Sequence, residues 1–584
     1  MESKQHFYAE DGTKLIYRTW TPETPRHRVI VMLHRGHEHS GRMAEMAAFY
    51  CQQGYLVYAW DARGNGESEG ERDAADHFTD FGRDLQTFMA LVETQSGIRS
   101  EETVLIASSM GAVIAASWLH DYAPSIRGLI LATAAFDIRL YVPFAMPMLK
   151  LARKLGVMPT VSSYVKSKLL TQDRREQFAY NDDPLISSSI ATDLLIDTHY
   201  TAQRLLDDAG AITTPIMMLC AGRDFVVSRR AQRRFYERLG SSMKQWRYYP
   251  DTSHAIFHDW QRPEVFADCL RFIETLFERE LPPVLAVNDD QQGYSRDRAD
   301  AVRLPSYHPE YGLTRLSLHT LGKLSEGIRL GHKTGFDSGQ TLDYVYRNQA
   351  AGRSFLGKMI DRTYLNSPGW VGIRRRKQLL ESLLTRYLPE SATASVLDIA
   401  AGNGRYLLDK VASQPALSAE LRDYAPENIA VMTQAVEERG LTERVRVVEK
   451  DAFDLASYDQ PAQFQLAVVS GLFELFTDNE PLSVALSGIA TQLQTDGILL
   501  YTNQPWHPQQ TLIAKTLTNH RGQPWFMRCR TQAEMDQLVM AAGFEKVATY
   551  VEPGGMFTVS VARLSSTSSS EAPLAEQDVE SNLA

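Results

Sequence analysis

The feature that constrains the fold of this chain most is a pair of separate series of short apolar segments, each alternating with helical patterns. In the first half the apolar segments lie at 28–34, 54–61, 103–109, 128–135 and 215–224. The second half repeats the alternation at 395–402, 419–424, 444–451, 465–471 and 497–503. Such alternation is typical of βαβ units, in which helices cover both faces of a parallel sheet. One hydrophobic core holds about 250–300 residues. The chain has 584, so we predict an α/β protein with two doubly wound domains.

Polar stretches separate and follow these two domains. The segment 283–340 begins with many Asp, Gln and Pro residues and is predicted to be a linker. Residues 565–584 are polar and are expected to be disordered. The expected domains are therefore 1–282 and 341–564, the second of which begins with a helical segment.

Composition narrows the classes of function. The net charge of −10 argues against general nucleic-acid binding, which needs a basic surface. The four cysteines are far apart, so neither a disulfide framework nor a zinc site is expected. The N-terminal segment lacks the basic start and apolar stretch of a signal peptide, and no run of about 18 apolar residues occurs. We expect a cytoplasmic protein, with peripheral contact with the inner face of the membrane as an alternative.

Residues 107–111, Ala-Ser-Ser-Met-Gly, lie between an apolar segment and a helical one. They match the nucleophile elbow G-x-S-x-G with Ala at its first position, which makes Ser109 the candidate nucleophile. Small residues on either side of the serine let strand and helix approach, and the Met110 N–H can face a developing oxyanion. The alternative is a turn in which Ser108 or Ser109 only caps the helix.

Two further residues complete a predicted triad. Asp224 ends an apolar segment, and His254 follows another predicted strand. Ser, Asp, His is the order of the triad in the α/β-hydrolase fold. His254 would accept the Ser109 proton, and Asp224 would orient the imidazole and stabilise its cation. Taken singly, an Asp at a strand end is usually a turn residue and a lone His is usually structural.

Several stretches of the first half resemble the monoacylglycerol lipase and lysophospholipase branch of the α/β hydrolases, the serine aminopeptidase-like group. They lie at 33–42, 61–72, 107–111, 180–186 and 221–228. The resemblance implies an α/β-hydrolase fold with a helical cap at about 136–212, and a small-molecule or lipid ester as substrate. Apolar cap residues would line an acyl-chain channel or form the cap's own core, namely Val142, Phe144, Met146, Met148 and Leu149.

The chain departs from this family in one loop, which normally reads H-G-x-G-E-H-S-G. Arg35 and His37 stand at its two glycine positions, and by position the Gly36 N–H would be the second oxyanion donor, with that of Met110. This departure motivates an alternative in which the hydrolase half only binds a substrate. No metal site is predicted, because the other two histidines of the loop match family positions and no carboxylate or cysteine set completes a site.

The second half carries a small-residue turn between a strand and a helix. Ala400, Gly402 and Gly404 let the backbone pass close to a bound ligand, and dinucleotide-binding proteins use a similar turn. Polar side chains lie in or just after four of the strands, namely Asp398, Asp423, Asp451 and Ser470. Asp423 is placed to bind ribose hydroxyls, and Asp451 lies where an adenine amino group would sit. Each acidic residue alone could be a strand-end cap.

Residues 366–564 resemble the class I S-adenosylmethionine-dependent methyltransferases, with Ala400 in place of the first glycine of their motif. A helix followed by a hairpin turning at 553–555 is expected of that family and not of a dinucleotide-binding half. The resemblance implies a Rossmann-like fold with S-adenosyl-L-methionine as cofactor, held by the turn and the strand-end residues named above.

Three features lie near the predicted methyl-acceptor site, and two of them allow more than one interpretation. His507 is either a base or a packed loop residue. The basic run 374–377 is either a solvated face or a surface for an anionic acceptor or a lipid headgroup. The segment 327–352 precedes the methyltransferase core and would close over its site.

Together these features predict a bifunctional enzyme, in which a lipase-like serine ester hydrolase is fused to a methyltransferase and the two act on linked steps. One alternative is an active methyltransferase whose hydrolase half is only a substrate-binding module. Another is a C-terminal domain that binds the cofactor as a sensor. Neither the methyl acceptor nor the oligomeric state follows from the sequence.

Overall fold

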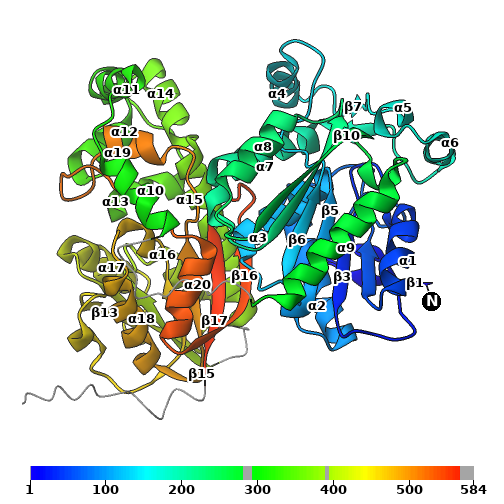
Figure 1. Ribbon diagram of the computed structural model, residues 1–584. Helices are drawn as coiled ribbons and strands as arrows, with labels where there is room; N and C mark the ends of the chain where they lie inside the picture. Colours follow the sequence, from blue (N-terminus) through cyan, green and yellow to red (C-terminus); the bar gives the residue numbers. More distant parts are fainter. Residues whose placement is uncertain (1, 281–292, 389–392, 566–584) are drawn as a thin grey trace, which may run out of the picture.

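An eight-stranded sheet forms the centre of the first half of the computed structural model, which describes residues 2–280, 293–388 and 393–565 (Figure 1). The strand order is β1-β2-β4-β3-β5-β6-β9-β10, and all pairs from β4 onward are parallel. The central strands are almost wholly apolar because helices bury both faces of the sheet. The strands are β1 Glu2–Tyr8, β2 Lys14–Trp20, β3 Val29–Leu33, β4 Leu56–Trp60, β5 Thr103–Ser108, β6 Gly128–Ala132, β9 Ile216–Arg223 and β10 Lys244–Ser253.

Two layers of helices cover this sheet. α1 (Ala44–Gln52) and α9 (Arg262–Glu278) share one apolar core with its first face. α2 (Thr79–Ser96), α3 (Met110–Tyr122) and α8 (Arg229–Arg238) share another core with the opposite face. This arrangement confirms the predicted α/β-hydrolase architecture.

The segment between β6 and β9 forms a cap at one end of the sheet, where the strands finish (Figure 1). Its longest element is α7, whose apolar side packs against α3 and α4. The cap elements are α4 Ala145–Leu155, β7 Thr160–Ser162, α5 Ser167–Leu170, α6 Arg174–Asp182, β8 Ser189–Ala191 and α7 Thr192–Asp208.

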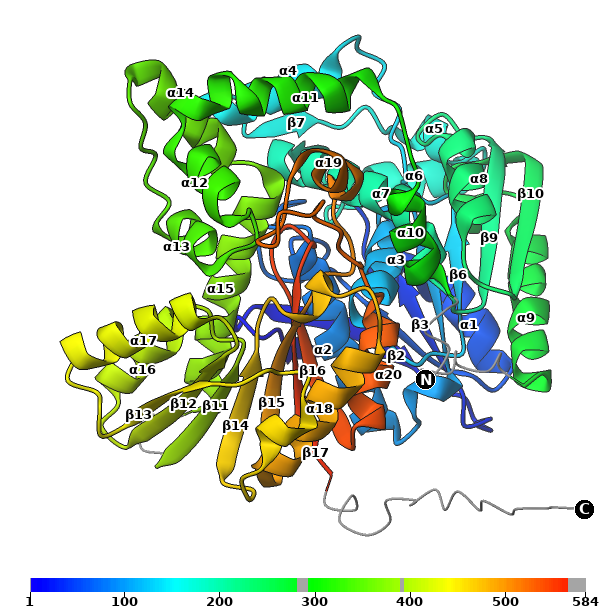
Figure 2. The same ribbon diagram turned by 90° about the vertical axis from the view of Figure 1, so that its left-hand side faces the viewer.

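A seven-stranded sheet forms the centre of the second half, in the order β13-β12-β11-β14-β15-β17-β16 (Figure 2). β17 is antiparallel to both its neighbours, and the five strands before it are parallel. This order confirms the predicted Rossmann-like fold with a terminal hairpin. The strands are β11 Ala394–Ile399, β12 Leu417–Asp423, β13 Val445–Glu449, β14 Phe464–Val469, β15 Leu493–Asn503, β16 Phe544–Val551 and β17 Thr558–Leu564. The helices beside them are α15 Pro368–Tyr387, α16 Arg405–Ser413, α17 Pro426–Glu438, α18 Glu480–Gln492, α19 Gln510–Thr516 and α20 Gln532–Ala541.

The expectation of a linker at 283–340 is wrong for the part that the structure describes. Residues from 294 onward form helices, which lie above the end of the second sheet with α14 and α19 (Figure 2). Their polar composition was misleading because these helices are short and bury few residues, and α11 buries none. They are α10 Tyr294–Arg303, α11 Pro309–His319, α12 Glu326–Thr334, α13 Gly339–Arg347 and α14 Phe355–Leu365. The proposed tail at 565–584 falls, except for its first residue, outside the described residues.

The two halves touch along the terminal hairpin of the second sheet. β16 lies against α2 and α3 of the first domain, and α20 also contacts α3 (Figure 1). Lys546 of β16 donates to the Tyr122 carbonyl over 2.8 Å, and Arg204 of the cap donates to the Gly555 carbonyl over 3.0 Å. Within the described ranges, no helix combines the length and apolar character that crossing a membrane requires.

Candidate active sites

Ser109 lies at a sharp turn between β5 and α3. Its backbone has φ 53° and ψ −112°, a left-handed conformation that costs free energy in a non-glycine residue. A Cβ on Gly111 would lie 2.4 Å from the His34 carbonyl oxygen, so only glycine lets the start of α3 approach the loop after β3. The small residues of the elbow thus hold the serine at the carboxyl end of the central strand.

The structure brings the three predicted triad residues together. His254 Nε2 lies 3.0 Å from Ser109 Oγ, and His254 Nδ1 lies 2.9 Å from Asp224 Oδ2. The other Asp224 oxygen accepts from the N–H groups of Val226 and Val227. Burial alone would raise the pKa of the Asp224 carboxyl, but the charge of His254 and these hydrogen bonds lower it. Asp224 is therefore held ionised, as orienting an imidazole requires.

Gly36 and Met110, the predicted oxyanion donors, lie next to each other. A Cβ on Gly36 would lie 3.7 Å from Met110 Cβ. His34 fixes the start of this loop, because its Nδ1 lies 2.7 Å from the Arg35 carbonyl and its Nε2 accepts from the Ala62 N–H. Burial lowers the pKa of His34, which keeps the ring neutral and able to accept at Nε2.

The two residues at the glycine positions of this loop have structural partners. Arg35 is buried, pairs with Glu38 and lies over the ring of Tyr180 in the cap. His37 adopts φ 68°, a conformation more usual for glycine, and its Nδ1 lies 2.7 Å from Asp73 Oδ2. The side chains thus tie the loop to its surroundings.

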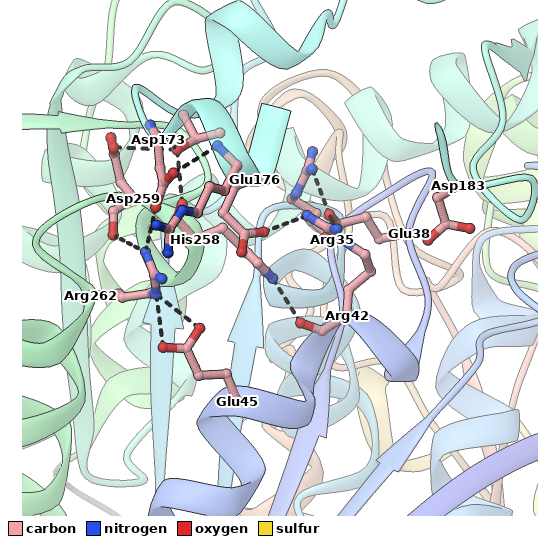
Figure 3. Close-up of polar contacts among 12 residues, drawn as sticks. Arg35, Glu38, Arg42, Glu45, Asp173, Glu176, Asp183, His258, Asp259 and Arg262 are labelled. Carbon is pink, nitrogen blue, oxygen red and sulfur yellow. Dashed lines mark hydrogen bonds and ion pairs between the residues drawn. The ribbon is translucent and has the colours of Figure 1, made fainter. Parts of the chain in front are cut away.

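A polar network joins this loop to the cap and to the segment after His254 (Figure 3). Arg42 donates to Glu38 and, over 2.8 Å, to Glu176 of α6. Burial would raise the pKa of Glu38, but Arg35 and other cations lower it to about 2. Arg262 contacts Glu45 and Asp173, and His258 Nε2 lies 2.8 Å from the Arg42 carbonyl.

The five apolar cap residues named from the sequence differ in burial, so they do not act as one group. Only Leu149 is buried, in a small core with Leu195 and Ile196 of α7, and Met146 packs against that core. Val142, Phe144 and Met148 are exposed, Phe144 by 81%. The exposed residues therefore do not belong to the core of the cap.

In the second domain, Ala400, Gly402 and Gly404 all have positive φ, near 55–58°. A Cβ on Gly402 would meet nothing within 4 Å, and the Gly402 N–H donates to Asp423 Oδ2 over 2.8 Å. The buried Asn403 Oδ1 has no hydrogen-bond partner among the described residues. The turn therefore offers open space and a polar group to a ligand.

The predicted cofactor residues that follow lie at one edge of the sheet. Asp398 is buried in β11, and Tyr406 donates to both its oxygens over 2.7 Å. Burial raises the pKa of the Asp398 carboxyl to about 7, and the nearby Asp423 adds to the rise. Asp423 ends β12, Asp451 follows β13 and accepts from the Phe453 N–H, and Ser470 follows β14. These strands are parallel, so their ends share an edge.

A cavity of ≈ 200 Å³ lies at the same edge, between the sheet and the helices above it. Residues after β14 and β15 form its floor, and α11, α13, α15 and α19 form its walls. Its lining includes Leu318, Asp337, Leu342, Tyr364, Trp370, Ile373, Arg376, Gly471, Glu474, Gln504, His507, Ile513, Trp525, Met527 and Phe557. Asp337 and Leu342 come from the segment 327–352, which was expected to close over this site.

Two cavity residues form a pair that sequence reasoning did not predict, namely Arg376, which belongs to the basic run 374–377, and Glu474. The basic run 374–377 lies inside α15 and not at its start, and Arg376 is buried, so the expectation of a solvated face is wrong for it. Arg376 Nη1 donates to Glu474 Oε1 over 2.8 Å, and its guanidinium covers the Phe557 ring. Arg376 follows Trp370 and Ile373 at intervals of three on the buried side of the helix. That spacing was a usable signal.

His507 lines the cavity and is buried. Its Nδ1 accepts from the Gln509 N–H over 2.9 Å, so the proton of the neutral ring is on Nε2. Burial lowers the pKa of His507 to about 4. The ring is a neutral donor at Nε2 near pH 7, which argues against the interpretation of His507 as a base.

Comparison with known proteins assigns each half to a family. The family described as "Putative methyltransferase" matches residues 269–564, and the one described as "Serine aminopeptidase, S33" matches residues 24–261. Uncharacterized protein YnbC of Escherichia coli is 42% identical over 575 residues, covering 96% of this chain and 98% of that protein. Monoacylglycerol lipase of Mycolicibacterium smegmatis is 24% identical, covering 46% of this chain and 96% of that protein. Monoglyceride lipase of Rattus norvegicus is 28% identical over 46% of this chain and 88% of that protein.

Proposed function

We propose, from the premise that this chain belongs to that methyltransferase family and carries a serine aminopeptidase-like hydrolase domain, that it is a bifunctional enzyme. Its first domain would hydrolyse a carboxylic ester, as the names of the lipase relatives suggest. Its second domain would transfer a methyl group from S-adenosylmethionine. The Ser109–His254–Asp224 hydrogen-bond chain is the observation that carries the first activity.

The first activity follows from the positions of these side chains. His254 Nε2 takes the Ser109 proton as Oγ attacks the ester carbonyl, and the acyl group stays on Ser109 as the alcohol leaves with that proton. His254 then activates water, which releases the acid. The N–H groups of Gly36 and Met110 would stabilise the negative oxygen of each tetrahedral intermediate.

A fluorophosphonate probe tests the hydrolase proposal. Intact protein should be labelled at Ser109, and Ser109→Ala should abolish labelling. Ser108→Ala is the matched control, because Ser108 lies beside the nucleophile without its place in the turn, and this variant should still be labelled. Absence of labelling in folded wild-type protein would favour the alternative in which this domain only binds a substrate.

The second activity is supported by how well the described residues suit the cofactor. The open turn at Gly402 would accommodate the methionine part, and the carboxylate of Asp423 would bind ribose hydroxyls. Asp451 would contact the adenine, with Ser470 at the cofactor's edge. Bound S-adenosylmethionine supplies an electrophilic methyl carbon; the chain supplies position and a place for the acceptor.

Calorimetric titration with S-adenosylmethionine tests the second activity. Binding should occur in the wild type and weaken by about tenfold or more in Asp423→Ala, because charge-assisted hydrogen bonds are lost. A folded wild-type protein that releases no binding heat and gives no methylated product would contradict the proposal. Binding without any methylated product in a lysate would favour a cofactor sensor.

Linked action of the two sites is testable in cells. Metabolite profiles of strains carrying Ser109→Ala and Asp398→Ala should change in the same compounds, since both activities reside in one chain. Changes in unrelated compounds would argue that the two activities are independent.

Peripheral contact with an anionic membrane is supported by the exposed face of α4. Met148, Leu151 and Leu155 are exposed on α4, and Val142 and Phe144 are exposed just before it. The segment 142–158 has three basic residues and no acidic one. α11 and α14, at the same end of the molecule in both views, add exposed Leu and Phe residues (Figures 1 and 2). Apolar residues beside basic ones suit the surface of an anionic bilayer.

Vesicle co-sedimentation tests this contact. Phosphatidylglycerol vesicles should retain the wild type and phosphatidylcholine vesicles should not. A Phe144→Asp/Met148→Asp double variant should stay in the supernatant with both. Retention of the variant on phosphatidylglycerol would exclude α4 as the contact.

A further inference from the structure

The walls of the cavity above the second sheet are mainly aromatic and aliphatic. Trp370, Trp525 and Phe557 contribute rings, and Ile373 and Ile513 contribute aliphatic groups. The Trp370 and Trp525 rings lie 6.1 Å apart, centroid to centroid. Such a lining favours an apolar ligand with few polar groups.

Four buried polar atoms on residues that line this cavity have no hydrogen-bond partner among the described residues. They are Tyr364 Oη, whose hydroxyl can donate or accept, and Arg376 Nε, Glu474 Oε2 and Trp525 Nε1, which belong to residues more than nine-tenths buried. Buried polar groups are nearly always paired in folded proteins, so unpaired ones beside a cavity point to a ligand. The ligand must offer both an acceptor, for Arg376 and Trp525, and a donor, for Glu474.

A hydroxyl group meets this requirement better than a charged group. Its oxygen accepts from N–H donors, and its O–H donates to a carboxylate. A ligand carboxylate would be repelled by Glu474, and a ligand ammonium by Arg376. The Arg376–Glu474 pair also has no net charge, which suits a neutral ligand.

We propose that this cavity is the methyl-acceptor site and that the acceptor is an apolar alcohol or phenol whose hydroxyl lies between Arg376 and Glu474. The proposal rests on the methyltransferase function proposed above. The floor of the cavity includes Gly471 and Gln504, which follow β14 and β15, so the cavity lies at the same sheet edge as Asp398 and Asp423.

Glu474 receives the proton in this arrangement. Bound S-adenosylmethionine would supply the methyl group: as the hydroxyl oxygen gained the methyl carbon and the carbon–sulfur bond broke, the hydroxyl proton would pass to Glu474 Oε2, leaving a methyl ether and a thioether. Arg376 donates to the hydroxyl oxygen from Nε and also holds the Glu474 carboxylate through Oε1. His507 takes no proton here, because its Nδ1 is already bonded to the Gln509 N–H.

Calorimetric titration of the full chain with 2-naphthol and with 1-octanol tests the site. The first probe is an aromatic alcohol and the second an aliphatic one, so the comparison shows which kind of apolar group the cavity prefers. At least one should bind. The corresponding methyl ether, 2-methoxynaphthalene or 1-methoxyoctane, should bind about tenfold more weakly, because it cannot donate to Glu474. Glu474→Gln should weaken binding of the hydroxyl probe by about tenfold and remove the difference from the ether. Glu480→Gln, on the exposed start of α18, is the matched control and should change neither.

A second variant tests the site even if Glu474→Gln does not fold, and its readout is binding and not enzyme activity. Ile513→Trp should fill the cavity and abolish probe binding while the affinity for S-adenosylmethionine is unchanged. Equal binding of hydroxyl and ether probes by the wild type, or no binding of either hydroxyl probe, would overturn the inference. Failure to bind S-adenosylmethionine with normal probe binding would instead count against the proposed methyltransferase alone.

Discussion

The hydrogen bonds of Asp224 hold its carboxylate in the position from which it orients His254. Two backbone N–H groups hold one oxygen and His254 contacts the other. Asp224→Asn keeps the shape but favours the wrong imidazole tautomer, so kcat for ester hydrolysis should fall by about 10⁴-fold. Steady-state assays with a p-nitrophenyl ester measure this. Asp251→Asn, at an exposed position near the end of β10, should leave kcat unchanged. If kcat of Asp224→Asn decreased by less than about tenfold, Asp224 would not be the residue that orients the histidine.

Asp398 makes the stability of the protein without cofactor depend on pH. Its folded-state pKa of about 7 lies above its ordinary value of 3.8, so the folded protein holds the proton more tightly than the unfolded chain. The free energy of unfolding should therefore fall as pH rises from about 4 to about 7, and level off above. Scanning calorimetry from about pH 5.5 to 8.5 should show a Tm that decreases toward about pH 7 and then levels off.

Asp398→Asn should flatten this pH dependence, because the amide is neutral throughout and can still accept from Tyr406. Asp496→Asn is the control, since Asp496 is exposed and its positive φ also suits asparagine. The same slope in wild type and Asp398→Asn would assign the pH dependence to another group.

At the scale of elements, the elbow between β5 and α3 depends on close approach of backbones. Gly111→Ala would put a Cβ 2.4 Å from the His34 carbonyl, and the loop that carries Gly36 would have to move. We expect a loss of about 3 kcal/mol in unfolding free energy, measured by urea denaturation.

Gly82→Ala in α2 is the matched control for Gly111→Ala. Its Cβ would lie an ordinary 3.5 Å from the Tyr122 ring, in a helix interior. This variant should gain about 0.5–1 kcal/mol, because alanine favours helix more than glycine does. Equal effects of the two changes would show that the elbow tolerates a side chain.

The elements that could be predicted best were those marked by a pattern in consecutive residues. Apolar runs located the central strands, and Asp423 at a strand end was expected near the glycine-rich turn, which it contacts. α10 to α12 were not predicted, because short helices with polar exposed sides resemble a linker. Arg376 and Glu474 are 98 positions apart, and no local pattern reveals such a pairing.

At the scale of the whole molecule, a buried charge cluster joins the hydrolase cap to the helices of the second half. Asp208 of α7 contacts Arg298 of α10, accepts from Tyr294 over 2.7 Å and lies 2.8 Å from His120 of α3. Arg204 on the same cap helix reaches the Gly555 carbonyl of the terminal hairpin. The cap is thus held both to its own domain and to the other one, so disturbance of one half should reach the other.

Arg298→Met tests this connection. Asp208 is almost fully buried, and removing its cation should cost about 3 kcal/mol of interaction between the halves. Scanning calorimetry should show that the unfolding transition of Arg298→Met lies at lower temperature than that of the wild type and separates into two.

Arg296→Met is the matched control, because Arg296 also lies on α10 but pairs with Asp300 and Asp478 of its own half. That variant should unfold in the same number of transitions as the wild type. Coincident thermograms for wild type and Arg298→Met would mean that the Arg298–Asp208 ion pair does not couple the unfolding of the two halves.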